Sequence, residues 1–293
     1  KSVQVKTKET KQGKINCIQL NQDWQILTCT GSIQNDQSIE QFEKTLNAPL
    51  LPEMVFDKNF VEFQHIPSGY ALRFDAFHAL LSWMQHPYPP QKVAAAKVWQ
   101  NSRTHPDDLE TTTEKPFDWS FSTRYSGHIV KSTVINDDDD NDNKQSNNNN
   151  DNNQQENTIK LSDIRDPSQG IDYSLLKRNE RILYFDEIVL FEDELADNGV
   201  AKLTVKFRVM PSCFFALVRF WMRNDDMAFR VNDTRIFHSF VKPQLAHQCV
   251  REWSSREDTF ENMQKQNTLP QDPTLYGDEQ LIVPVLPLVD GKM

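Results

Sequence analysis

The hydrophobic pattern is clearest between residues 181 and 240, where alternating and apolar runs are separated by turn signals. Apolar side chains occupy every second position of residues 203–209, which is typical of a strand with one buried face. Residues 213–222 are nearly all apolar, as expected of a central strand covered on both faces. We predict four strands here, at residues 181–191, 203–209, 213–222 and 227–240. Their connections are short, one of them at Asn198-Gly199, so the strands should form an antiparallel meander.

Helical periodicity appears in the first third of the chain. Residues 36–46 repeat apolar side chains on one face, and Asn35 or Asp36 is available as the N-cap. Asp75 is available to cap a second helix, whose apolar residues follow the i, i+3, i+4, i+7 spacing at Phe77, Leu80, Leu81 and Met84. Two more helices are predicted at residues 91–102 and 256–265, the latter capped by Ser254 or Ser255.

Two further segments alternate with the period of a strand. Residues 60–63 and 70–74 are spaced like the two arms of a hairpin. Residues 119–125, WSFSTRY, place Trp119, Phe121, Thr123 and Tyr125 on one face and polar side chains on the other. Together with the meander, these elements predict an α+β fold, predominantly an antiparallel β-sheet meander with several flanking helices.

Composition adds one feature to this picture. The 293-residue chain carries a formal net charge of -10 and a mean hydropathy of -0.66, despite its 18 Phe, 6 Trp and 6 Tyr. Residues 136–157 are rich in Asn and Asp and contain no aromatic or aliphatic side chain. Seven acids and one lysine give this segment a charge of -6, which leaves -4 for the rest.

A segment of this composition has nothing to offset the entropy of ordering. We interpret it as a disordered surface loop and not as an acidic interaction tail, and we expect it to interrupt a single domain at residues 24–270. The ends, residues 1–23 and 271–293, are expected to be poorly ordered or irregular.

Charge and targeting signals limit the class of partner and the compartment. An acidic balance argues against nonspecific nucleic-acid binding. No uncharged run reaches the ~20 residues that span a bilayer, and the first residues lack the apolar core of a signal peptide. The four cysteines are scattered without CxxC spacing, so a zinc ribbon or a dense disulfide framework is not expected, and a reduced intracellular compartment fits best. We therefore expect a cytoplasmic protein, with the nucleus as a second compartment.

One cluster of carboxylates invites a catalytic interpretation. Six acids lie close together in sequence: Asp186, Glu187, Glu192, Asp193, Glu194 and Asp197. Clustered carboxylates bind metal ions in hydrolases, so a metal-dependent hydrolase is the alternative function. On a strand, however, neighbouring acids point to opposite faces, and a charged strand end that keeps the sheet soluble is the simpler interpretation.

Other catalytic signals are weak. None of the seven histidines forms an HxH, HxxxH or HExxH motif, and there is no GxSxG, P-loop or GxGxxG. We therefore predict no catalytic residue, no metal site and no cofactor.

The strand predicted at residues 227–240 is unusually polar at its centre. Arg230, Asn232 and Thr234 share one face, and Asp233 and Arg235 share the other. One interpretation is an internal ladder of salt bridges to Glu192, Asp193 or Asp197. The other is a groove rich in hydrogen-bond donors that binds a peptide carboxylate or an acidic motif.

Several strings, taken in order, resemble one family. They are LPEMVF (51–56), VAAAKVWQNSR (93–103), KPFDWSFSTRYSG (115–127), ILYFDEIVLFEDELADNGV (182–200), LTVKFRVMPSCFFALVRFWMR (203–223) and RVNDTRIFH (230–238). From about residue 24 to residue 257 the chain resembles the TIPRL family of target-of-rapamycin signalling regulators. His78 departs from the family pattern, in which an Asp is usual.

The resemblance implies a protein that is not an enzyme. Such a protein would bind the catalytic subunits of type 2A-like Ser/Thr phosphatases, including their C-terminal tail, and would modulate target-of-rapamycin signalling. It could also bind a second phosphatase-associated regulator, and we expect neither nucleic acid nor membrane as a partner. The partner-binding residues implied by motif position are Asp118, Trp119, Arg230, Asn232, Asp233 and Arg235. A structural adaptor without effect on phosphatase activity is the remaining rival.

Overall fold

The structure is a computed structural model. It describes residues 3–90, 92–94, 112–114, 117–132, 170–225, 227–242, 249–265 and 286–287. The strands are β1 (Gln4–Thr10), β2 (Gly13–Gln19), β3 (Trp24–Thr30), β4 (Met54–Val55), β5 (Phe60–His65), β6 (Tyr70–Asp75), β7 (Lys92–Ala94), β8 (Thr112–Glu114), β9 (His128–Lys131), β10 (Tyr184–Asp193), β11 (Gly199–Val209), β12 (Cys213–Asn224), β13 (Ala228–Ser239), β14 (Val250–Thr259) and β15 (Leu286–Pro287). The helices are α1 (Asp36–Leu46), α2 (Ala76–Gln85), α4 (Tyr173–Leu176), α5 (Phe260–Lys265) and the 3-10 turn Ile66–Ser68.

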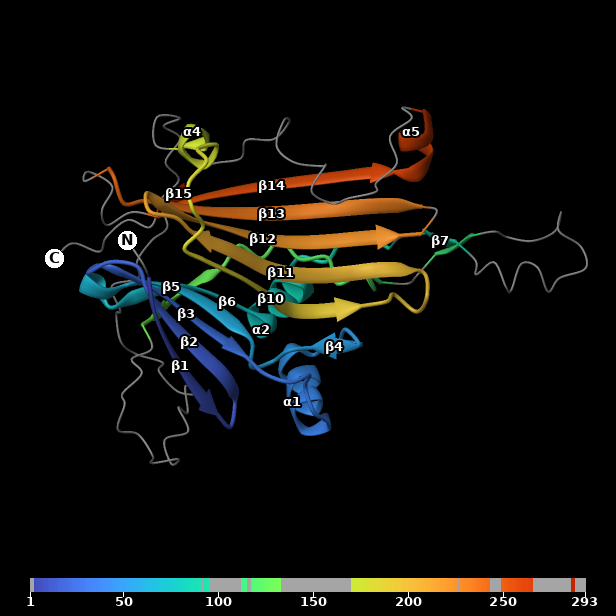
Figure 1. The fold of residues 1–293 in the computed structure, drawn as a ribbon. Helices are drawn as coiled ribbons and strands as arrows, with labels where there is room; N and C mark the ends of the chain where they lie inside the picture. The colour runs from blue at the N-terminus through green and yellow to red at the C-terminus, as the bar shows by residue number, and fades with distance from the viewer. Residues whose placement is uncertain are drawn as a thin grey trace, which may run out of the picture.

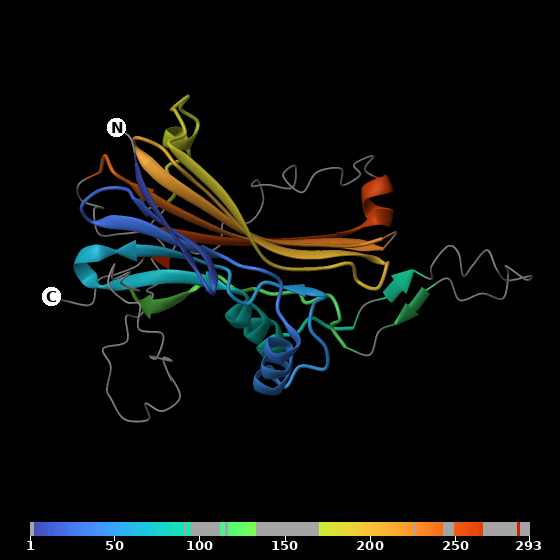
Figure 2. The same ribbon diagram turned by 60° about the horizontal axis from the view of Figure 1, so that its bottom comes forward.

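Two large antiparallel sheets dominate the molecule (Figure 1). The first has the strand order β1-β2-β3-β5-β6-β9, and the second has the order β15-β14-β13-β12-β11-β10-β4. A two-stranded sheet, β7-β8, lies at one end of the larger sheet (Figure 2). The predicted α+β class with an antiparallel meander is confirmed.

The meander runs from β10 to β14, each strand pairing with the next. Even-numbered residues of β12 face the first sheet, and Phe214, Ala216, Val218 and Phe220 are buried there. Because the side chains of a strand alternate, the register of β12 with β13 places the even-numbered residues of β13 on this same inner face. The polar side chains of β13 are therefore divided between an inner face and an outer face.

The first sheet contains elements that the sequence predicted and elements that it did not. The expected hairpin is present as β5 and β6, joined by the 3-10 turn. The expectation of poorly ordered or irregular structure at residues 1–23 is wrong for residues 4–19, because β1 and β2 pair over seven residues and β2 also pairs with β3. The side chains of β1 are almost all exposed, so the strand lacks the apolar alternation that predicts one.

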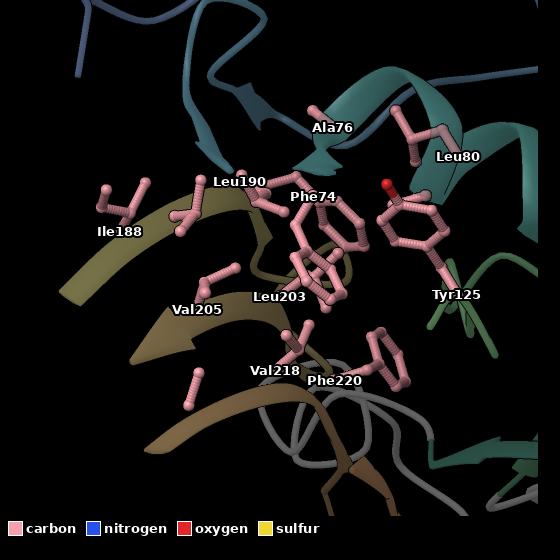
Figure 3. Packing of buried hydrophobic residues seen from close by; sticks show 14 of the residues in the cluster. Phe74, Ala76, Leu80, Tyr125, Ile188, Leu190, Leu203, Val205, Val218 and Phe220 are labelled. Carbon is pink, nitrogen blue, oxygen red and sulfur yellow. The ribbon is translucent and has the colours of Figure 1, made fainter. Parts of the chain in front are cut away.

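The core lies between the two sheets and reaches α2. Phe63 of β5 stacks on Phe214 of β12 with ring centroids 5.3 Å apart and meets Phe207 of β11 edge to face. In Figure 3, Phe74 and Tyr125 lie side by side near α2, facing residues of the larger sheet such as Phe220. These contacts fix the smaller sheet and α2 against the meander.

Both N-terminal helices begin as predicted. The side chain of Asn35 accepts a hydrogen bond from the Ser38 amide and caps α1, and Asp75 caps α2 through the His78 amide. Figure 2 shows α1 and α2 next to each other on one side of the molecule. Phe42 of α1 meets Phe77 of α2 edge to face, with ring centroids 5.2 Å apart.

Three predicted elements need correction. Residues 92–94 form β7 and not a helix, and residues 95–102 of that prediction lie outside the described residues. The helix predicted at 256–265 begins at Phe260, because the preceding residues pair with β13 as β14. Residues 119–125 are not a strand, since Phe121 has a positive φ of 56° and these residues have no strand pairing.

Two expectations concern larger segments. The Asn/Asp-rich loop predicted at residues 136–157 lies outside the described residues, as does most of 271–293. None of the described helices is long and apolar enough to cross a membrane.

Candidate functional site

The six predicted partner-binding residues are all buried, each less than a tenth exposed. The structure does not gather them on one surface. Arg230 and Asn232 lie on the inner face of β13 and bond Ser122 and Thr123, which follow Asp118 and Trp119 in the chain, whereas Asp233 and Arg235 lie on the outer face. The two sets therefore have different surroundings.

The inner set binds a segment of the same chain, residues 117–127, which we call the crossing segment. Arg230 donates from Nη1 to the hydroxyl of Ser122, and Asn232 donates from Nδ2 to the carbonyl of Thr123 at 2.8 Å. Arg251 of β14 donates from Nη1 to the carbonyl of Ser126 at 2.7 Å. The bonds to Thr123 and Ser126 satisfy backbone carbonyls that have no strand partner in the crossing segment.

Asp118 organises the start of the crossing segment. Its Oδ2 accepts hydrogen bonds from the Trp83 indole at 3.2 Å and from the Tyr88 amide at 3.0 Å. Its Oδ1 accepts from the Ser120 amide and hydroxyl at 3.2 and 2.5 Å. Trp119 belongs to the main hydrophobic core. Both residues thus hold the end of α2 and the crossing segment together.

Arg230 connects this buried network to the surface. Its guanidinium lies 3.7 Å from the centre of the Tyr88 ring and donates from Nε to Glu257 at 2.8 Å. Arg124 packs over Tyr88 at 4.8 Å and donates to its hydroxyl at 3.1 Å. Arg124 is exposed, the Glu257 side chain is 49% exposed, and Tyr88 is half-buried. We call these three residues the Tyr88 surface.

The outer set forms ion pairs within the sheet. Asp233 accepts two hydrogen bonds of 2.7 Å from Arg219, and Arg235 lies 3.3 Å from the same carboxylate. Arg235 also donates to the Ser254 hydroxyl at 2.8 Å. The interpretation of an internal ladder is therefore right for the outer face.

The prediction that Glu192, Asp193 or Asp197 pairs with the arginines of this ladder is wrong. Glu192 pairs with Lys202 at 2.9 Å, and Asp193 accepts hydrogen bonds from the Glu53 and Leu195 amides. Glu187 pairs with Lys206 at 3.2 Å. Within the described part of the chain, no three of the acids from 186 to 197 bring ligand atoms together. These contacts are those of a charged strand end and a turn.

A different group can hold a metal ion. Asp75, His78 and His128 each place one ligand atom within 4.8 Å of the others. The search for histidine motifs in the sequence did not find this group, because His128 lies fifty positions after His78 and only the pairing of strands brings the two together. The D-x-x-H spacing of Asp75 and His78 at a predicted helix start was the signal available.

Electrostatics differ between the members of this group. Burial alone would raise the pKa of Asp75, but hydrogen bonds from His78 and the charges of His78 and Arg73 outweigh it and lower the pKa to about 2. Burial lowers the pKa of His128 to about 4, helped by the charges of His78 and Arg73 and opposed by Asp75. Burial also raises the pKa of Tyr125 well above its ordinary value.

Comparison with known proteins places these features in a family. The model of the TIP41-like family matches residues 54–264, which include the crossing segment and all of the meander. A TIP41-like protein of Arabidopsis thaliana is 37% identical over 271 residues, covering 91% of this chain and 86% of that protein. The TIP41-like protein of Homo sapiens is 32% identical over 268 residues, covering 92% and 85%.

A further relative carries a functional name. It is the type 2A phosphatase activator tip41 of Schizosaccharomyces pombe, 29% identical over 273 residues, with 92% of this chain and 94% of that protein covered. The family model and the relatives agree with the resemblance found in the sequence. The chain belongs to the TIP41-like family.

Proposed function

We propose that this protein is a non-enzymatic regulator that binds the catalytic subunits of type 2A-like Ser/Thr phosphatases and so modulates target-of-rapamycin signalling. The observation that carries the proposal is its membership of a family in which two relatives are named type 2A phosphatase activators. Binding would include the C-terminal tail of the catalytic subunit and would take place in the cytoplasm, with the nucleus as a second compartment.

We place the contact on the Tyr88 surface. Hydrogen bonds within the chain already engage Arg230, Asn232 and Asp118. In this proposal these buried residues hold the Tyr88 surface in position and do not contact the partner. Tyr88 and Arg124 offer an aromatic ring and a guanidinium, the side chains that contribute most to protein interfaces. An exposed guanidinium also suits a peptide that ends in a carboxylate.

The test is recovery of a type 2A-like catalytic subunit from cell lysate, with its C-terminal peptide as competitor. We expect the wild-type chain to recover the subunit and the peptide to release it. Arg124→Glu and Tyr88→Ala should weaken recovery at least tenfold, because each removes a contact of the Tyr88 surface. The matched control is Lys14→Glu, which reverses an exposed charge on the β1-β2 hairpin.

Two outcomes would count against the proposal in different ways. Failure of the wild-type chain to recover any such subunit would refute phosphatase binding. Normal recovery by both variants, with thermal unfolding unchanged, would refute the Tyr88 surface and leave phosphatase binding intact. A phosphatase assay with and without the protein separates a regulator from an inert adaptor.

A further inference from the structure

The group of Asp75, His78 and His128 is built by the junction of a strand and a helix. Asp75 is the last residue of β6 and the N-cap of α2, and His78 lies one turn into that helix. His128 opens β9, whose register with β6 places it opposite Arg73, two residues before Asp75. The sheet therefore fixes the position of His128 relative to the other two residues.

The ligand atoms are close enough to share one ion. Asp75 Oδ1 lies 2.8 Å from His78 Nδ1, and Asp75 Oδ2 lies 3.9 Å from His128 Nε2. In a tetrahedral site with metal–ligand distances of about 2.0–2.2 Å, neighbouring ligand atoms are separated by about 3.4 Å. The two separations are made to different oxygens of Asp75, and one ligand atom from each of the three residues lies within 4.8 Å of the others, so side-chain rotations that bring these atoms together would complete the geometry.

A hydrogen-bond chain sets the proton on His128. Tyr125 donates its hydroxyl hydrogen to the carbonyl of Arg73 at 3.0 Å. Because that hydrogen is used, the hydroxyl oxygen must accept from His128 Nδ1, which lies 2.7 Å away. A neutral His128 then presents the lone pair of Nε2 toward Asp75, and outer partners of this kind orient histidine ligands in metal sites.

Access also fits a cation. The Arg73 guanidinium contacts Asp75 at 3.0 Å, and Glu62, 2.6 Å from Arg73, offsets the charge of that guanidinium. The His78 and His128 side chains are 40% and 24% exposed, which gives solvent a path to the ligand atoms. The rings stack with centroids 3.7 Å apart, so both can turn an edge to the same point.

We propose that Asp75, His78 and His128 bind a divalent transition-metal ion, with Zn²⁺ as the best-suited ion and water completing the coordination. Two imidazoles and one carboxylate are ligands of zinc, whereas magnesium and calcium prefer oxygen alone. Binding moves the proton of His78 from Nδ1 to Nε2, because the ion replaces the hydrogen bond from Nδ1 to Asp75. This site is independent of the proposed phosphatase binding.

The experiment is zinc titration of the full, metal-stripped chain by calorimetry, followed by Co²⁺ substitution read by visible absorption. We expect one site of micromolar or tighter affinity and a Co²⁺ spectrum typical of tetrahedral nitrogen and oxygen ligands. His78→Gln and His128→Gln should each weaken this site at least tenfold and should abolish the rise in melting temperature that zinc causes. His86→Gln, an exposed histidine at the end of α2, is the matched control and should behave as wild type.

The site is overturned if the wild-type chain shows no such binding. It is also overturned if both variants keep wild-type affinity, since the zinc would then bind elsewhere on the chain. His78→Gln changes a side chain that is well exposed, so it should fold, and its melting temperature without metal checks this.

Discussion

Arg230 is surrounded by groups of its own chain. It donates to Ser122 and Glu257, lies under the Tyr88 ring, and is 1% exposed. Removing a buried guanidinium would leave its partners unpaired and would loosen the crossing segment. A binding defect in an Arg230 variant would therefore report on folding, which is why Arg124 is the better residue for testing recognition.

The same reasoning gives a stability prediction for Asp118. Asp118→Ala should lower the free energy of unfolding by about 3 kcal/mol, because it leaves the Tyr88 and Ser120 amides without their acceptor, whereas the Trp83 indole keeps the Asp118 carbonyl at 3.1 Å. Asp118→Asn keeps one acceptor oxygen and should cost less. Chemical denaturation measures both changes.

Asp225→Ala is the control for that experiment. Its side chain is 48% exposed and pairs with the exposed Arg223, so its removal should change the free energy of unfolding by less than about 0.5 kcal/mol. Equal losses in the Asp118 and Asp225 variants would contradict the role given to Asp118.

His128 makes stability depend on pH. Its folded pKa of about 4 lies below the ordinary 6.5, so the unfolded chain binds more protons between these values. Stability from this group is present above about pH 6.5 and is lost as the pH falls toward 4. Asp75, His78, Arg73 and Tyr125 face the ring.

The measurement is the unfolding midpoint in denaturant from pH 7 to pH 4.5, with a chelator present. Wild type should lose more stability over this range than His128→Gln, in which no group titrates at that position. Parallel pH profiles for the two proteins would show that His128 is not the source.

At the scale of elements, glycines with a positive φ are needed where the chain turns between paired strands. Gly199 opens β11 at φ 155°, and a Cβ atom there would lie 1.9 Å from the carbonyl oxygen of Arg223. Gly69 also has a positive φ, 69°, but has no atom within 4 Å of the position of a Cβ. A side chain at Gly199 would thus cause a steric clash, whereas a side chain at Gly69 would cause backbone strain alone.

Gly199→Ala should therefore cost more than about 2 kcal/mol of unfolding free energy, since backbone atoms of β12 must move. Gly69→Ala should cost about 1 kcal/mol, the strain of a left-handed conformation. Thermal or chemical unfolding of the pair gives the comparison, and a larger loss at Gly69 would contradict the geometry.

The elements that the sequence predicted share a clear local signal. The strands β11 and β12 follow from alternation and apolar runs, and α1 and α2 follow from apolar spacing behind Asn35 and Asp75. β14 was not predicted, because Ser254 and Ser255 were interpreted as caps of a helix at residues 256–265. Their hydroxyls instead bond Arg235 and Asn232 across the sheet.

The candidate sites depend on contacts between distant parts of the chain. Alternation correctly divided the polar residues of β13 between two faces, but it could not say that the crossing segment covers the inner one. The grouping of Asp75 with His128 likewise requires the register of β6 and β9. Such pairings are set by tertiary packing and leave no periodic mark in the sequence.

At the scale of the whole molecule, two sheets share one core, and the crossing segment and α2 lie along the inner face of the larger sheet. This arrangement leaves the Tyr88 surface at the place where α2 ends and the crossing segment meets β13 and β14. The charge of -10 does not argue against an acidic or carboxylate-bearing partner there, because residues 136–157 carry -6 of it.

The most direct test of the central claim is the affinity of the purified protein for a purified type 2A catalytic subunit, intact or lacking its C-terminal tail. Our account predicts saturable binding to the intact subunit, at least tenfold weaker binding to the truncated one, and a change in phosphatase activity on binding. Absence of binding to the intact subunit would contradict the account.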